Sequence, residues 1–209
     1  MAATRKRELD LPVAALDLPE GFSLPDWSAP LDLEEHLRCV PADATVKGMF
    51  LNATVETVKG LGGPSLAEER FFAFRDYPLR RSLELLVEGA RHVYADQPPR
   101  EGLRRLARPG YAVFADSLIG KVVFAAIGRD PAAIYKLAAK AWRHAASVGK
   151  LEPQIVDPHT ALIRVSELYL TDAVGIAIAE GVLEACGRDG YVAQRMRSPL
   201  EGEFLIHWS

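Results

Sequence analysis

Histidine and cysteine side chains are the residues of this chain best suited to bind a metal or to carry nucleophilic chemistry. The chain has two cysteines, Cys39 and Cys186, and five histidines: His36, His92, His144, His159 and His207. No two histidines have the spacing of a helical metal-binding pair, so no metal site is predicted. Two cysteines this far apart do not make a disulfide framework and favour a reducing compartment.

Two serine-containing segments resemble catalytic motifs only in part. The segment around Ser117 lacks the first glycine of a hydrolase nucleophile elbow and lies in a helical pattern. Ser147-Val148-Gly149-Lys150 resembles the end of a phosphate loop, but it follows a helix instead of a strand. Both are interpreted as structural, and the chain is expected not to be an enzyme.

Arginines cluster at Arg100, Arg104, Arg105 and Arg108. A basic cluster is typical of nucleic-acid binding, but glutamates are interleaved with this one and no glycine–aromatic stacking motif accompanies it. We interpret it as a solvated or protein-contacting face. The net charge of −3 also gives no reason to expect nucleic acid as a partner.

Two central helices are predicted, over Tyr111–Ile127 and Asp130–Ser147. The first is apolar on nearly every face and must be covered on most of them, while Asp130-Pro131 provides the N-cap and first-turn proline of the second. These helices either enclose a pocket for a small apolar ligand or pack against a second copy of the chain. The candidate pocket residues are Phe50, Tyr111, Phe114, Phe124, Trp142 and Arg143. Ordinary core packing explains the aromatic residues equally well, and Arg143 suits a helix C-terminus.

The elements on either side of the central helices complete an α+β fold. Helical patterns cover about 46–60, 78–94 and 98–108, and the capping box Ser65-Leu66-Ala67-Glu68 predicts a short helix through Phe72. After Gly149 the pattern alternates. It predicts a hairpin with strands over Leu151–Val156 and Thr160–Val165, a helix over Thr171–Cys186, and a second hairpin with strands over Tyr191–Arg197 and Glu203–Trp208. We expect an N-terminal helical subdomain followed by a small antiparallel four-stranded sheet with a helix (ββαββ).

Residues 1–45 differ from the rest of the 209-residue chain in composition. They hold 4 Lys/Arg against 9 Asp/Glu and five of the 14 prolines. We interpret them as an acidic, proline-rich extension of a single domain over 46–209. The extension either wraps over the domain, reaches a partner or forms a flexible tail. No apolar run is typical of a signal peptide or a membrane span, so a cytoplasmic protein without membrane insertion is expected.

Residues 46–209 resemble a myxobacterial paralogous family of unknown function. The resemblance is carried by the Lys47-Gly48 opening with Phe50-Leu51, Tyr77-Pro78 before a leucine-rich helix, the Gly110–Gly120 helix and the terminal Trp208. That family is similar in its order of elements to the heme nitric-oxide/oxygen-binding (H-NOX) domains, and more loosely to the 4-vinyl reductase and transport-particle folds. The resemblance implies a sensory or adaptor domain with a small-molecule or protein partner, or a homodimeric interaction subunit.

The resemblance also allows the sequence to be checked for the residues that bind heme in H-NOX domains. The axial histidine of heme-binding relatives lies early in the helix after the apolar central one. Here that stretch, Asp130–Leu137, contains no histidine. The Tyr-x-Ser-x-Arg signature that holds the heme propionates has no counterpart before the last helix. The resemblance therefore implies a domain without heme, although Tyr135 is an alternative iron ligand in principle.

Overall fold

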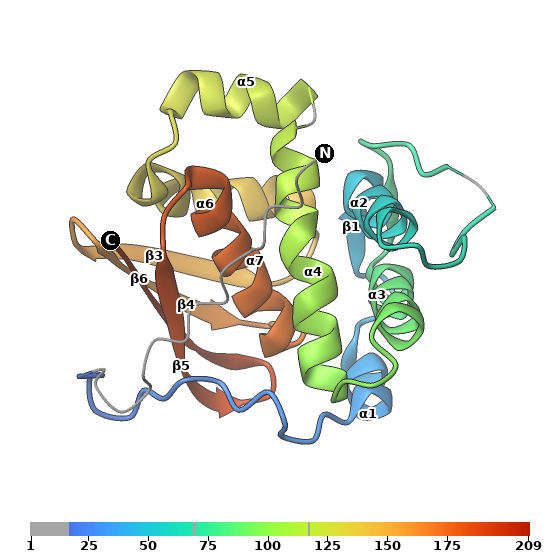
Figure 1. The fold of residues 1–209 in the computed structure, drawn as a ribbon, viewed down its shortest axis with the longest axis horizontal. Helices are drawn as coiled ribbons and strands as arrows, with labels where there is room; N and C mark the ends of the chain where they lie inside the picture. Colours follow the sequence, from blue (N-terminus) through green and yellow to red (C-terminus); the bar gives the residue numbers. More distant parts are fainter. Residues whose placement is uncertain (1–16, 69, 117) are drawn as a thin grey trace, which may run out of the picture.

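The computed structural model describes residues 17–68, 70–116 and 118–209 and shows two halves joined by a long central helix, α4 (Figure 1). A mixed helix-and-sheet fold, as expected from the sequence, is confirmed. In this part of the chain the elements are α1 (Leu33–Cys39), β1 (Thr45–Lys47), α2 (Gly48–Gly60), β2 (Asp76–Pro78), α3 (Leu79–Val93), α4 (Pro99–Asp116), α5 (Leu118–Ile127), α6 (Pro131–Ala145), β3 (Lys150–Asp157), β4 (Thr160–Ser166), α7 (Asp172–Cys186), β5 (Gly190–Ser198) and β6 (Glu201–Trp208).

One half is a four-stranded antiparallel sheet in the order β3-β4-β6-β5. Its alternating apolar residues face α6 and α7, because one face of each strand must be buried. Register places Ala161 opposite Ile206 and Ile163 opposite Phe204. These side chains form one core with Tyr135 of α6 and the α7 residues on that face.

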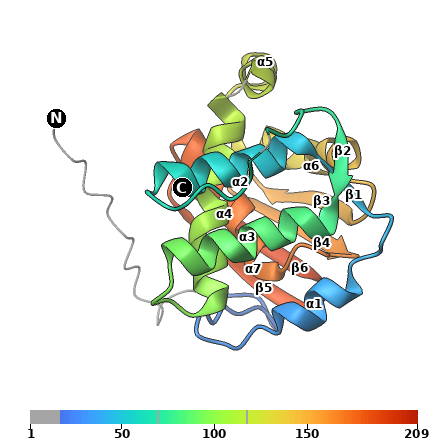
Figure 2. The ribbon, with the colours of Figure 1, turned by 90° about the vertical axis from the view of Figure 1, so that its right-hand side faces the viewer.

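The other half is a layer of helices, α2 and α3, that packs on α4 (Figure 2). Its core contains leucines at helical spacing, including Leu83 and Leu86 of α3 and Leu103 and Leu106 of α4. Ala173, Val174 and Ala177 of α7 belong to the same core. Helix α7 therefore contributes to both cores, and α4 lies between α7 and the helical layer.

The prediction that the helical pattern over 98–108 ends before Pro109-Gly110 is wrong, because α4 runs through these two residues to Asp116. An internal proline costs a helix about 3 kcal/mol, so packing against α7 must offset that loss. At Gly181 of α7 an added Cβ would lie 2.6 Å from the Arg108 carbonyl oxygen and 2.8 Å from the Tyr111 Cβ. The two helices meet at a distance that only glycine allows. The predicted helix over Tyr111–Ile127 is divided between α4 and α5.

The capping-box helix predicted through Phe72 is also wrong: the described residues between 65 and 72 contain no helix. The Ser65 hydroxyl donates to the Ala67 carbonyl (3.0 Å) instead of capping a helix. The chain here instead leads into a second sheet that the sequence did not predict. In this sheet β1 pairs with β2, placing Val46 opposite Tyr77.

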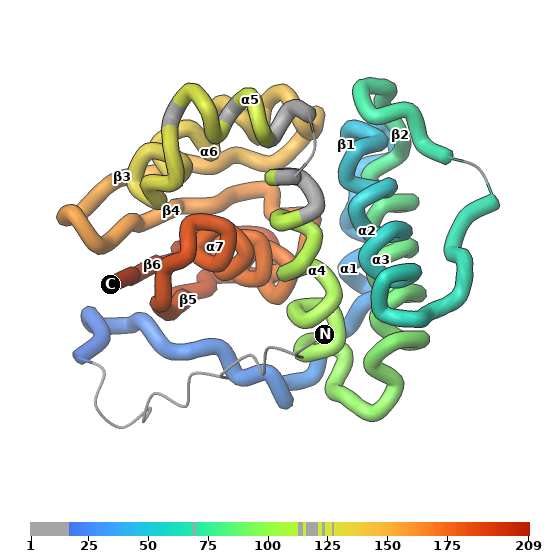
Figure 3. Tube along the Cα trace, turned by 45° about the horizontal axis from the view of Figure 1, so that its top comes forward, coloured from blue at the N-terminus to red at the C-terminus, as the bar shows by residue number. Residues whose placement is uncertain are grey.

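The described part of the N-terminal extension lies along β5 and then joins the helical half (Figure 3). Ser23 and Gln194 exchange two backbone hydrogen bonds of 3.0 and 2.8 Å. Asp32 caps α1 by accepting from the Glu35 N–H (2.8 Å), and Leu33 and Val40 are in the helical core. No described helix is long and apolar enough to cross a membrane.

Gly181→Ala tests the close contact between α4 and α7. We expect a loss of about 1–3 kcal/mol in the free energy of unfolding, because the added methyl group must push Arg108 and Tyr111 away. Gly110→Ala is the matched control, since a Cβ there meets no atom within 4 Å. That change should instead stabilise α4 by about 0.5–1 kcal/mol. The free energy of unfolding of both variants and of wild type is measured by urea denaturation. If Gly181→Ala is as stable as wild type, the close contact between α4 and α7 is contradicted.

Candidate functional site

The structure brings two of the predicted pocket residues together. Tyr111 of α4 and Phe124 of α5 meet edge to face, with ring centroids 6.5 Å apart. Both pack on the core beneath the sheet. Burial raises the pKa of Tyr111 to about 12, so its phenol is neutral at physiological pH. This pair links α5 to the body of the protein.

The other predicted pocket residues lie elsewhere. Phe50 and Trp142 pack on the helical core. The Trp142 indole N–H donates to the Val148 carbonyl (2.8 Å), which fixes the turn from α6 into β3. Arg143 is exposed, and the Phe114 side chain lies outside the described residues. The predicted residues are thus distributed over two cores and the surface.

A groove of about 600 Å³ lies instead between α1 and the N-terminal end of α7. We call it the α1–α7 groove. It is lined by residues 30–32, α1, the start of α7, Arg100, and residues 196–200, which are the end of β5 and the turn into β6. Its apolar lining comes from Pro30, Leu31, Met196, Pro199 and Leu200. The size is within the range of small-molecule sites, roughly 300–1,000 Å³.

His36 gives the groove a buried hydrogen-bonding group. Only 5% of its surface is exposed, and its Nε2 lies 2.8 Å from the Tyr169 carbonyl oxygen. A carbonyl only accepts, so Nε2 carries the proton and Nδ1 is an acceptor. Burial lowers the His36 pKa, against the opposing effects of the Tyr169 carbonyl and Asp172. The imidazole in the groove wall is therefore neutral at pH 7.

Arg100 and Asp172 form a buried ion pair in the same groove, with side chains 15% and 10% exposed. The pair begins a row of contacts between α4 and α7, which we call the α4–α7 ladder. Arg104 binds Glu180 (2.9 Å) and Arg108 binds Glu184 (2.8 Å). The Arg104 guanidinium also lies over the Trp27 ring, 4.6 Å from its centroid.

The ladder corrects our interpretation of the arginine cluster as a solvated or partner-contacting face. Arg100 and Arg104 are mostly buried and pair within the chain. The partners lie more than 70 residues away, so local spacing could not reveal them. A signal was nevertheless present: Arg104 and Arg108 are four residues apart, and so are Glu180 and Glu184. This spacing places each pair of like charges on one face of its helix, but it does not say which helix pairs with which.

The residues on α6 do not fit a heme ligand set. Of the described histidines, His144 is the one on α6, and it is exposed near the helix C-terminus. Tyr135 is 2% exposed and its hydroxyl donates to the Ala179 carbonyl of α7 (2.9 Å). Burial raises its pKa well above the usual value, which opposes the phenolate that would bind iron. The described residues also include no cluster of three His, Cys, Asp or Glu side chains suited to a metal.

A family model described as a protein of unknown function, DUF2378, matches residues 40–209. The chain belongs to this family. Solved structures with a similar fold are H-NOX proteins. The S. oneidensis protein in the Fe(II)NO state has 10% identity and a TM-score of 0.59, and covers 78% of this chain and 99% of its own. No curated protein matches the chain.

Two further H-NOX structures agree with that similarity. The Fe(II) unliganded protein from K. algicida is 15% identical, with a TM-score of 0.55 over 78% of this chain and 96% of its own. An oxygen-binding H-NOX domain related to soluble guanylate cyclases is 10% identical, with a TM-score of 0.57 over 78% and 92%. At these identities the likeness shows that this DUF2378 chain has an H-NOX-like fold.

The pKa of His36 predicts how the stability of the DUF2378 chain depends on pH. Because the folded pKa lies below the ordinary 6.5, the unfolded chain binds the proton more readily. The stabilising contribution of neutral His36 to the free energy of unfolding is fully present above about pH 6.5. It is lost as the pH falls below that value. When urea unfolding is measured from pH 8 to pH 5, the free energy of unfolding should therefore decrease less for His36→Gln than for wild type. His92→Gln is the exposed control, and an identical decline in all three proteins would contradict the burial of His36.

Proposed function

We propose that this chain is a non-enzymatic ligand-binding domain of a cytoplasmic signalling or regulatory system, with an H-NOX-like fold and without heme. The observation that carries the proposal is the α1–α7 groove. It combines an apolar lining, a volume of about 600 Å³ and one buried neutral acceptor, His36. Sites of this kind bind small molecules by shape and a few placed polar groups.

The charges around the groove favour a neutral ligand. Arg100 pairs with Asp172, Arg197 with Glu201, and Glu35 with Arg38. An anion in the groove would have to displace one of these carboxylates. A cation would meet Asp32, whose carboxylate already accepts from the Glu35 N–H as the cap of α1. A largely apolar molecule with one hydrogen-bond donor would need only the Nδ1 of His36.

Two features support the absence of heme. The Tyr135 hydroxyl is already bound to the Ala179 carbonyl, and the first turns of α6 offer no imidazole. An iron ligand at this position would require the α6–α7 hydrogen bond to break and a buried phenol to lose its proton.

Protein purified from its own host tests the proposal. Native mass spectrometry should detect a bound small molecule, and the absorption spectrum should lack a Soret band. Cys39→Trp, which places an indole in the α1–α7 groove, should remove the bound molecule. Ala95→Trp, an exposed change outside that groove, should retain it. A Soret band, or retention in Cys39→Trp, would contradict the proposal.

A homodimeric interaction subunit without a ligand is the second candidate, and α5 is the observation that favours it. Val122 of α5 is 66% exposed and Leu137 of α6 is 39% exposed. In Figure 1, α5 lies at the edge of the molecule and packs on the end of α4. An exposed valine on a helix at the edge of the molecule offers an apolar surface that a second copy could cover.

Val122→Glu tests this candidate. If α5 forms the interface, the native mass should fall from dimer to monomer, because a carboxylate would be buried without a partner. Thermal stability of the monomer should change by less than about 0.5 kcal/mol, since the side chain is exposed. A mass that is the same in both proteins excludes an α5 interface.

A further inference from the structure

The loop between α2 and α3 presents two phenylalanines to solvent on a backbone that is fixed from the inside. Phe72 and Phe74 are each 70% exposed. Asn52 binds both backbone groups of Phe71, accepting from its N–H (3.1 Å) and donating to its carbonyl (2.6 Å). The Phe72 N–H donates to the Tyr77 hydroxyl (3.0 Å).

The start of α2 holds the same loop. The Gly48 N–H donates to the Arg75 carbonyl (2.9 Å), and the Met49 N–H donates to the Ala73 carbonyl (3.1 Å). A Cβ at Gly48 would lie 2.4 Å from the Phe72 carbonyl oxygen. The Lys47-Gly48 opening of the domain therefore needs glycine so that this loop can approach α2.

A loop held this way has already lost the conformational freedom that binding would remove. Exposed aromatic side chains on a rigid backbone are the usual anchors of protein contacts. Arg70 and Arg75, which flank the phenylalanines, are also exposed. We call Phe72 and Phe74 with these two arginines the aromatic tip.

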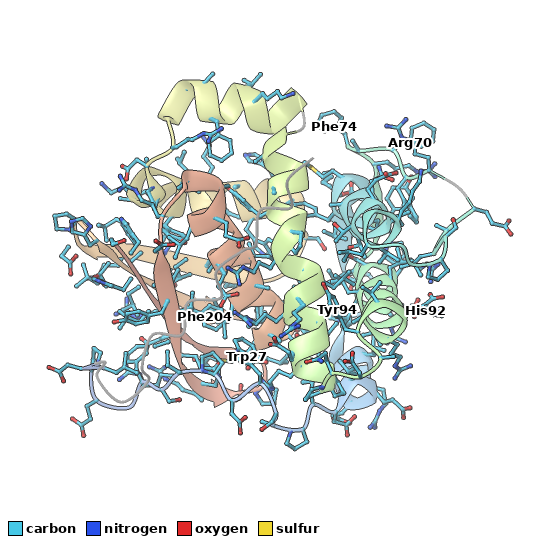
Figure 4. All side chains as sticks on the ribbon, viewed as in Figure 1. Trp27, Arg70, Phe74, His92, Tyr94 and Phe204 are labelled. Atoms are coloured by element: carbon cyan, nitrogen blue, oxygen red, sulfur yellow. The ribbon has the colours of Figure 1, made fainter. Side chains whose placement is uncertain are left out.

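A groove of about 420 Å³ with complementary properties lies at the other end of α3. Leu31, Val87, Ala90, Tyr94 and Leu103 give it an apolar lining, and Asp32 and Glu34 give it acidic groups against one cation, Arg91. We call it the α3 groove. The tip precedes the first residue of α3 and Tyr94 follows its last (Figure 4). Fifteen helical residues span about 22 Å, so one copy cannot fill its own groove.

We propose that the aromatic tip of one copy enters the α3 groove of a second copy. Arg70 and Arg75 would then meet Asp32 and Glu34 while the phenyl rings cover the apolar lining. Because the two surfaces differ, the contact is heterologous, and a pair of bound copies still has one free tip and one free groove. The assembly is therefore a chain or ring that grows with concentration. It needs no ligand in the α1–α7 groove, although the two grooves share Leu31 and Asp32.

The size of the tip indicates a weak contact. Each aromatic ring buries roughly 150–250 Å², whereas a stable interface needs about 800 Å² on each partner. Assembly should therefore appear as a rise in average mass over a concentration series in sedimentation equilibrium. Phe72→Ala/Phe74→Ala should lower the association constant about tenfold or more. Val156→Ala, which removes an exposed apolar side chain of β3, should leave it unchanged.

A mixing experiment distinguishes this contact from any symmetric dimer. Ala95→Trp blocks the α3 groove, so it and the tip variant should each be monomeric alone. Mixed together they keep one intact tip and one intact groove, and should form a one-to-one dimer that grows no further. The proposal is overturned by monomeric wild type at every concentration, by tip variants that assemble normally, or by a mixture that stays monomeric. Binding of monomers to phosphatidylcholine–phosphatidylserine vesicles that requires Phe72 and Phe74 would equally overturn it in favour of a membrane surface.

Discussion

The contact between α4 and α7 is the constraint on which the rest of the structure depends. Gly181 lets the two backbones approach at Arg108, and the α4–α7 ladder aligns them along their length. Both helices contribute to the helical core, and α7 contributes to the core beneath the sheet as well. Buried ion pairs add little net stability because desolvation offsets the attraction. The ladder is better understood as fixing the register of α4 on α7.

This contact explains why sequence reasoning failed at Pro109. The local signal, Pro109-Gly110, favours a helix end, and a proline inside a helix does lower the stability of that helix. The compensation comes from α7, whose Gly181 lies more than 70 residues further along the chain. Likewise, Ser65-x-x-Glu68 has the form of a capping box, but Asn52 and Tyr77 hold the following loop in another path. In both places tertiary contacts override a correct local preference.

The sequence was informative where residues within an element determine its ends and its periodicity. Asp130-Pro131 starts α6 and Gly187, with a φ of 67°, ends α7. The alternating segments after Gly149 coincide with strands within two residues. The α1–α7 groove was missed because no local pattern describes it. Its walls come from residues near 30, 100, 171 and 197, and a binding site assembled from four distant segments has no spacing to recognise.

The same geometry couples the proposed ligand site to the central helix. Arg100 and Asp172 line the α1–α7 groove and are also the first pair of the ladder. A molecule that binds more tightly when this pair is formed, or when it is broken, changes the free energy of the α4–α7 contact. By reciprocity, the strength of that contact sets the affinity for the molecule. The α1–α7 groove and the α4–α7 contact share these two charged side chains, so the proposed ligand site reaches α4 through an ion pair of the chain itself.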